Sequence, residues 1–207
     1  GQTLPIAHNT PAYGLGIYPL QFHGDLFYGH GGWMPGYAGH FAYSPERKIG
    51  VVVFGNHTGH NAGGEAFWRV AGVAIEYLER KYPAPEPPPA IEVPEYKLQE
   101  LTGYYRFNSP AVALNGGFER LLRSRHVYLE DGQLWMKTEG TWREPLVAHS
   151  ARTFSRRGER VPSISFHADE RGDVFMYDID WGHSSYTREA PTMHHLIGAW
   201  WVLSNLL

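Results

Sequence analysis

The sequence predicts an α+β fold in two parts, of which the first mixes strands with one helix and the second is made of strands. Three observations predict it: apolar runs broken by turns before residue 57, helical periodicity from residue 64 to 82, and short strand-like runs from residue 95 onward. We therefore expect four regions: a mixed domain at 1–83, a linker at 84–94, an antiparallel β-barrel at 95–189 and an apolar helix at 190–207.

The first expected strands are short and punctuated by glycine. Residues 13–18 predict one strand, and residues 25–30 predict the next, which would end in a turn at Gly31-Gly32. A tight hairpin should follow, with strands at 37–43 and 49–54. The second of these runs is apolar without alternation, so we expect both of its faces to be covered.

Residues 64–82 predict a helix because Phe67, Val70 and Ala74 recur at three- and four-residue spacing. Prolines occupy five of the seven positions from 83 to 89, a composition that favours an extended spacer between domains.

Beyond the spacer the sequence predicts hairpins and shows no helical period up to residue 188. Asp131-Gly132 lies between two alternating runs, which is a strong hairpin signal, and runs at 163–167 and 173–177 predict another. Regular spacing of this kind predicts a small antiparallel barrel. The apolar tail at 190–207 fits either a packed helix or the start of a membrane span, and its paired tryptophans suit a membrane interface.

Composition excludes several classes of function. A net charge of −3 provides no basic footprint for nucleic acid, and the absence of cysteine excludes a thiol nucleophile. The 12 histidines form no His-Glu-x-x-His motif, so we expect them at the surface or in loops, with no metal and no cofactor. The arginines at 120–125 and 156–157 predict a solvated barrel face, since no glycine-rich cradle for phosphate accompanies them.

One stretch resembles a known superfamily. His30-Gly31-Gly32 is followed by Gly36–Phe41 and by Val51–Asn56, in the order and spacing of the last active-site motif of serine β-lactamases, penicillin-binding proteins and related esterases. The resemblance covers about residues 11–82 and implies the C-terminal part of a β-lactamase/transpeptidase-like domain. More loosely, 101–105 and 130–134 resemble a lipocalin-like β-domain.

The resemblance also implies roles for single residues. His30 would hydrogen-bond the substrate or the catalytic network, and the backbone N–H of Trp33 would complete the oxyanion hole. Gly31, Gly32 and Met34 would bind substrate along one wall of the cleft. The plainer alternative is that His30 caps a strand and that the two glycines form a turn.

The chain departs from the superfamily in lacking a nucleophile. No Ser-x-x-Lys, Tyr-x-Asn or Ser-x-Asn occurs, and Lys137-Thr138-Glu139 lacks the glycine of the third motif. We therefore expect part of a serine hydrolase that acts through an acyl-serine on an ester, amide or peptide. Its partner would be a missing N-terminal part that carries Ser-x-x-Lys and Tyr-x-Asn, in the same or a separate chain.

An alternative from another class stays open at this point: a non-catalytic module whose barrel holds an apolar ligand or a partner. The superfamily resemblance favours a periplasmic, secreted or membrane-associated location, with membrane contact through the C-terminal helix.

Overall fold

The computed structural model describes residues 16–56, 63–82, 86–108, 120, 123–138, 143–179 and 184–190. Contacts between Cα atoms divide the chain into two compact units: of the described residues, 16–87 and Ile179 belong to the first, and 88–178 and 184–190 belong to the second. The first unit is a sheet with a helix on it, and the second is a closed barrel. The chain is therefore a mixed α and β protein.

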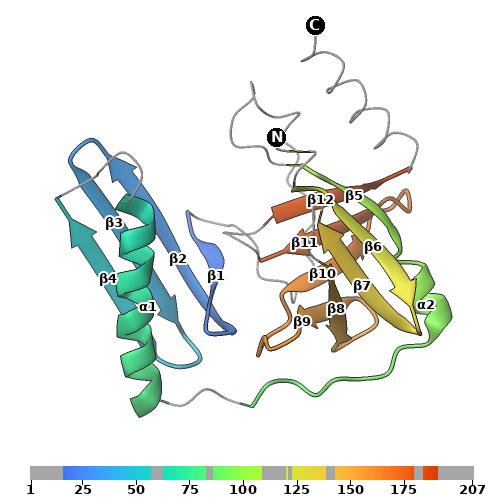
Figure 1. Cartoon of the computed structure of the whole chain (residues 1–207), viewed down its shortest axis with the longest axis horizontal. Helices are drawn as coiled ribbons and strands as arrows, with labels where there is room; N and C mark the ends of the chain where they lie inside the picture. Colours follow the sequence, from blue (N-terminus) through green and yellow to red (C-terminus); the bar gives the residue numbers. More distant parts are fainter. Residues whose placement is uncertain are drawn as a thin grey trace, which may run out of the picture. The chain divides into compact units, whose positions relative to one another are not determined.

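The first unit is a four-stranded antiparallel sheet with one helix packed on it (Figure 1). Its strands lie in the order of the sequence, and each pairs with the next. The elements are β1 (Tyr18–Phe22), β2 (Asp25–Met34), β3 (Tyr37–Ser44), β4 (Ile49–Gly55) and α1 (Gly63–Lys81). The predicted hairpin of β3 and β4 is confirmed, and so is the helix, to within one residue at each end.

Alternate residues of the strands form the core with one face of α1. Ala71 and Ile75 project from the helix onto the sheet, where Phe27 is fully buried. The buried cluster consists of Leu20, Phe22, Phe27, Ala42, Ile49, Ala71 and Ile75. Because side chains alternate between the two faces of a strand, this cluster fixes which residues point away from the helix.

Three details of this unit differ from the prediction. The first strand covers Tyr18–Phe22 rather than residues 13–18, of which 13–15 lie outside the described part. Gly31 and Gly32 continue β2 instead of turning. The run in β4 is covered on one face only: Val52 is 62% and Phe54 82% exposed, because α1 packs on the opposite face.

Arg47 ties the helix to the turns of the sheet. Its guanidinium donates to Asp25 and to Glu79 at 2.6 Å each, and it also donates to the carbonyl of Tyr82. Its side chain is only 4% exposed. A nearly buried cation thus joins the start of β2, the β3–β4 turn and the end of α1.

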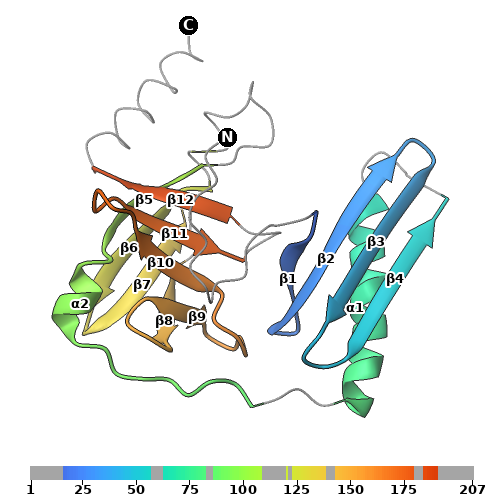
Figure 2. The same ribbon diagram turned by 180° about the vertical axis from the view of Figure 1, so that it is seen from behind.

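The second unit is an eight-stranded antiparallel barrel (Figure 2). Its closed order is β10-β11-β12-β5-β6-β7-β8-β9. The elements are α2 (Glu95–Gln99), β5 (Gly103–Phe107), β6 (Arg125–Glu130), β7 (Gln133–Thr138), β8 (Arg143–Ala148), β9 (Thr153–Arg156), β10 (Ile164–Ala168), β11 (Val174–Asp178) and β12 (Ser184–Glu189). The two hairpins predicted within the barrel are confirmed as β6–β7 and β10–β11.

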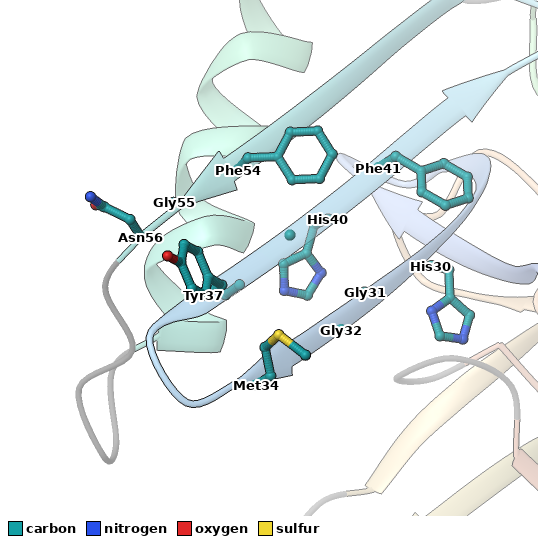
Figure 3. A pocket seen from close by; sticks show the side chains of 12 residues that line it. His30, Gly31, Gly32, Met34, Tyr37, His40, Phe41, Phe54, Gly55 and Asn56 are labelled. Atoms are coloured by element: carbon teal, nitrogen blue, oxygen red, sulfur yellow. The ribbon is translucent and has the colours of Figure 1, made fainter.

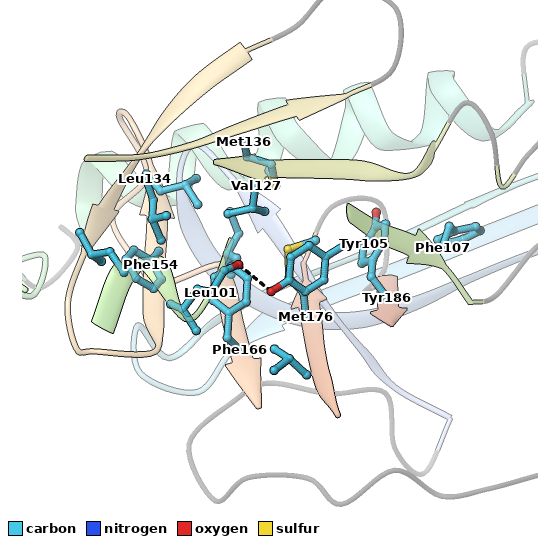
Figure 4. Packing of buried hydrophobic residues seen from close by; sticks show 14 residues of the cluster. Leu101, Tyr105, Phe107, Val127, Leu134, Met136, Phe154, Phe166, Met176 and Tyr186 are labelled. Carbon is cyan, nitrogen blue, oxygen red and sulfur yellow. Dashed lines mark hydrogen bonds between the residues drawn. The ribbon is translucent and has the colours of Figure 1, made fainter. Parts of the chain in front are cut away.

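Inward-facing side chains fill the interior of the barrel (Figure 4). The Tyr105 hydroxyl donates to the carbonyl of Leu101 at 2.7 Å, so this polar group is satisfied where it is buried. Fully buried members include Tyr105, Val127, Phe166, Met176 and Tyr186. Aromatic rings and methionines therefore occupy the interior, which is the space where a non-catalytic binding module would hold an apolar ligand.

Two expectations about the second unit are wrong. The short helix α2 was not anticipated, because five residues give no measurable period; it begins directly after Pro94, where the chain turns into the barrel. The arginines do not form a common solvated face, although Arg157 is exposed as expected. Arg125 is buried with its guanidinium over the Tyr186 ring, and Arg156 pairs with Glu144, Glu159 and Asp178.

The predicted C-terminal helix lies outside the described residues, which end at Ala190. Among the described helices, none has the length and apolar character required to cross a membrane.

Candidate functional site

The hairpin of β2 and β3 closes at Pro35-Gly36, four residues beyond the predicted turn at Gly31-Gly32. Proline fixes φ near −65° at the first turn position, and Gly36 takes a φ of 91° at the second, as a type II turn requires. Gly31 and Gly32 pair with His40 and Gly39 across the ladder. The first glycine marks a close approach within the sheet, because a Cβ on Gly31 would stand 2.1 Å from the His40 ring.

The backbone of Trp33 points away from β3. A two-residue turn makes Met34 and Tyr37 the hydrogen-bonded closing pair, and hydrogen-bonded pairs alternate with non-bonded ones. Trp33 belongs to a non-bonded pair with Ala38, so its N–H and C=O point to the other edge of β2. Among the described strands, none pairs with that edge beyond Gly29.

A hydrogen bond at Gly31 agrees with this orientation. Gly31 lies two residues before Trp33, and its backbone N–H donates to the Tyr18 hydroxyl of β1 at 3.2 Å. The same Tyr18 ring lies 5.1 Å from the His30 ring, centroid to centroid. His30 therefore stands beside β1, just before the section of β2 whose outer edge carries the Trp33 N–H.

Two facing glycines form the floor of a shallow trough on the face of the sheet that points away from α1 (Figure 3). We call this the glycine trough: its floor is Gly32 and Gly39, one wall is His30 and Phe41, and the other wall is Met34 and Tyr37. The Phe54 ring closes the end on β4, because it lies over Gly39, within 2.8 Å of where a Cβ would stand. The concavity measures about 780 Å³.

Four of the five predicted site residues therefore lie together: His30, Gly31, Gly32 and Met34 line this concavity. For Trp33, the fifth, the structure describes only the backbone, which lies in β2 between Gly32 and Met34. The sequence did not single out His40, Tyr37, Phe41 or Phe54, which border the same space. The sequence signal that could have identified them is the Pro35-Gly36 turn. This turn fixes the register of β2 and β3, and the register sets these residues opposite or beside His30-Gly31-Gly32.

His40 is a half-buried histidine in a strand, which contradicts the expectation of surface or loop histidines. Its ring packs 4.6 Å from the Trp68 ring of α1, and its Nδ1 is buried without a hydrogen-bond partner among the described residues. Burial lowers the pKa of His40, and the neighbouring His30 lowers it further. The neutral imidazole is thus favoured here.

Within the described residues, no three metal-binding side chains come together. His57, His60, His194 and His195, the pairs noted in the sequence, lie outside them. The trough offers the His30 imidazole and apolar walls, and the adjoining edge of β2 offers the Trp33 N–H; together such groups can bind and polarise a carbonyl group. It contains no hydroxyl nucleophile with a base beside it.

Comparisons with known proteins find weak structural likeness alone. No family model and no curated protein matches the chain. Similar solved structures include SurE (18% identity, TM-score 0.45, 89% of this chain and 40% of that chain) and SurE with D-Leu (16%, 0.36, 86% and 38%). Another is the octameric penicillin-binding protein homologue from Pyrococcus abyssi (18%, 0.30, 87% and 39%).

The chain spans about two fifths of the length of each of these proteins. One of the structures similar to this chain is thus a penicillin-binding protein homologue. With identities below 20% and TM-scores below 0.5, these likenesses bear on neither the reaction nor its residues.

Proposed function

We propose that the chain is the C-terminal part of a β-lactamase-related serine hydrolase, with a lipocalin-like barrel appended. In this proposal a missing N-terminal part carries Ser-x-x-Lys and Tyr-x-Asn, and the glycine trough and the outer edge of β2 form the facing wall of the cleft. The observation that carries the proposal is the direction of the Trp33 N–H, which points to an edge of β2 where no strand among the described residues pairs.

The reaction would be acyl transfer to water. The serine oxygen of the missing part attacks the substrate carbonyl carbon, and the Trp33 N–H donates to the oxyanion that forms. The alcohol or amine then leaves with a proton. Water attacks the acyl-serine, releases the carboxylic acid and restores the serine. Removing one oxyanion donor from such a site typically costs about 2.7–4 kcal/mol in the transition state.

The uncovered apolar surfaces also support a missing part. Met34, Tyr37, Val52 and Phe54 are each at least 60% exposed on the face of the sheet that points away from α1. Such contiguous patches on soluble proteins mark surfaces that contact something else. β4 also carries no charged residue or proline, although it is an edge strand of the described sheet, and native edges are usually protected by such residues.

The outer side of α1 is a second such surface. Val70, Val73 and Tyr77 are 55%, 68% and 71% exposed, and they form a stripe opposite the one that packs on the sheet. A helix that is apolar on two sides is typically buried on both. We expect the missing part to pack on the outer side of α1 and to lie across the exposed sheet face without filling the glycine trough.

The test is to extend the polypeptide upstream of residue 1 and label it with a fluorophosphonate probe. We expect a Ser-x-x-Lys serine upstream, labelling of the extended protein, and loss of labelling when that serine is replaced by alanine. The 207-residue chain alone should not be labelled. Labelling of this chain alone, lost on denaturation, contradicts the proposal, and so does an upstream sequence without Ser-x-x-Lys.

A further inference from the structure

Gly32 differs from Gly29 and Gly31 because no described residue lies close enough to exclude a side chain at this position. A Cβ on Gly29 would stand 2.0 Å from the Phe41 carbonyl oxygen, and one on Gly31 would meet the His40 ring. A Cβ on Gly32 would have no atom within 4 Å, and its φ is not positive. Internal packing therefore explains Gly29 and Gly31 and does not explain Gly32.

Glycine within a strand is destabilising by roughly 0.5–1 kcal/mol relative to alanine, and it often marks a place where a ligand approaches the backbone. Gly32 lies on the floor of the glycine trough, and no described residue lies over that floor within 4 Å of where a Cβ would stand. This position suits a group that comes from outside and lies flat on the strands.

The walls of the trough indicate the chemistry of that group. Met34, Tyr37, Phe41 and Phe54 offer a thioether and three rings, and the polar groups are the His30 imidazole and the Asn56 amide. The His40 ring lies on the opposite face of the sheet, against Trp68. Among the described residues that line it, none is Asp, Glu, Lys or Arg. A carboxylate placed here would lose water without meeting a permanent positive charge, which is unfavourable.

The length of the trough limits the size of the group. From β2 to β4 is two strand spacings, or ~10 Å, and the Phe54 ring occupies the far end by lying over Gly39. The remaining floor suits a single aromatic ring or a short branched chain.

We propose that the glycine trough binds the aromatic or branched apolar group of a neutral ester or amide, and that Gly32 determines the specificity by leaving room for it. As a statement about hydrolysis this rests on the proposed function, whereas the binding itself is a property of this chain. The trough begins at Gly32, next to Trp33, so a group lying in it places an attached carbonyl near the outer edge of β2.

Binding is measured on the 207-residue chain by backbone amide NMR at about pH 8, where imidazoles are mostly neutral. The probes are methyl phenylacetate, a neutral ester, and phenylacetate, the matching anion. The ester should shift the amide signals of Gly32, Gly39 and Tyr37 in a saturable manner. The anion should bind at least about tenfold more weakly. Equal or tighter binding of the anion, or no shift with the ester, overturns the proposal.

A pair of variants locates the binding. Gly32→Val should weaken ester binding at least about tenfold, because its side chain fills the floor of the trough. Val52→Thr changes the same face outside the concavity and should leave binding unchanged. If Gly32→Val alters the fold by circular dichroism, Gly32→Ala is used, with a smaller loss expected. Ester binding that none of the glycine variants weakens contradicts the proposal.

The two proposals fail separately. An upstream sequence without Ser-x-x-Lys removes the hydrolase and leaves ester binding by the trough standing. Fluorophosphonate labelling of the extended protein, together with an ester that shifts no trough signal, removes the trough proposal and leaves the hydrolase standing.

Discussion

The backbone of Gly31 lies directly against the imidazole of His40 on the neighbouring strand. A Cβ at position 31 would stand 2.1 Å from both Cε1 and Nδ1 of that ring. On its other side the ring is held by Trp68, at 4.6 Å between centroids. The histidine therefore has little room to yield, and a glycine at 31 is a packing requirement of this sheet.

The first prediction compares two adjacent glycines. Gly31→Ala should lower the free energy of unfolding by about 1–3 kcal/mol, as overpacking does. Gly32→Ala should change it by less than ~1 kcal/mol and can raise it, because alanine has less conformational freedom when unfolded and meets no atom here. Urea unfolding followed by Trp fluorescence measures both.

Its control is a double variant. In Gly31→Ala/His40→Ala the ring that causes the clash is gone, so the added cost of Gly31→Ala should largely vanish relative to His40→Ala alone. Equal destabilisation by Gly31→Ala in both backgrounds would show that the ring is not the obstacle.

The second prediction concerns pH. The pKa of His40 is lowered in the fold, so the unfolded chain binds a proton more readily than the folded one. The stability associated with neutral His40 is complete above its ordinary value of 6.5 and is lost as the pH falls through 6.5 toward the lower folded value. His40→Gln should therefore reduce the loss of stability of the sheet unit between neutral and mildly acidic pH.

The comparison for this prediction is a histidine in the other unit. His167, in the barrel, also has its pKa lowered by burial and by Arg152. His167→Gln should reduce the acid sensitivity of the barrel and leave that of the sheet unit unchanged. An identical pH profile of sheet-unit stability in wild type and His40→Gln would refute the role assigned to His40.

Much of the sheet unit could be predicted from the sequence, because its signals are local. A hairpin needs two β-rich runs and a turn, and α1 shows its period over five turns. What could not be predicted is which face is covered: β4 is apolar on both sides, and sequence pattern alone does not show that Val52 and Phe54 lack a covering layer.

The site shows the same limit. Gly31-Gly32 was interpreted as a turn, but glycine is common both in turns and where strands approach closely. The position of His40 on β3 is what shows that Gly31 belongs to the second case. In the barrel, β8, β9 and β12 gave weak signals, because short strands alternate over few residues. The interior position of Arg125 depends on the ring of Tyr186, about sixty residues away in the sequence.

The third prediction concerns the buried cation. Arg47→Met removes the cation shared by Asp25 and Glu79, and breaking a buried ion pair by removing one partner typically costs about 3–5 kcal/mol. Thermal unfolding should show a sharp loss of stability in the sheet unit. Arg80→Met is the matched control: it breaks an exposed pair with Glu76 and should change stability by less than about 1 kcal/mol. Similar losses in the two variants would mean that the Arg47 network is no more important than a surface pair.

The fourth prediction concerns the proposed role of His30. In the complete enzyme, His30→Ala should lower kcat/KM by about 10²-fold, as loss of a group in a proton-transfer or substrate hydrogen-bond network does. The fold should persist, because His30 is on the face of the sheet opposite the core. His23→Ala, which removes an exposed contact with Glu79, should leave kcat/KM unchanged. If His30→Ala has unchanged kinetics on several esters and amides, His30 has no role in the reaction and only packs beside Tyr18.

The fifth prediction separates the barrel from the chemistry. The spacer is anchored to the barrel at its far end, where the Ile91 N–H donates to the carbonyl of Ala148 at 2.9 Å and His149 hydrogen-bonds the carbonyl of Pro89. A cut after Pro87 therefore leaves these contacts with the barrel.

In the complete enzyme, removing residues 88–207 should alter substrate range or oligomerisation more than acylation by a small activated ester. The reason is that the described barrel fills its interior with its own side chains. Its two serine–histidine hydrogen bonds, His149 with Ser155 and His167 with Ser165, involve serines that are buried at 2% and 3% exposure and have no room for a substrate. Loss of acylation in a truncated protein whose catalytic domain remains folded by circular dichroism would place a barrel residue in the active site.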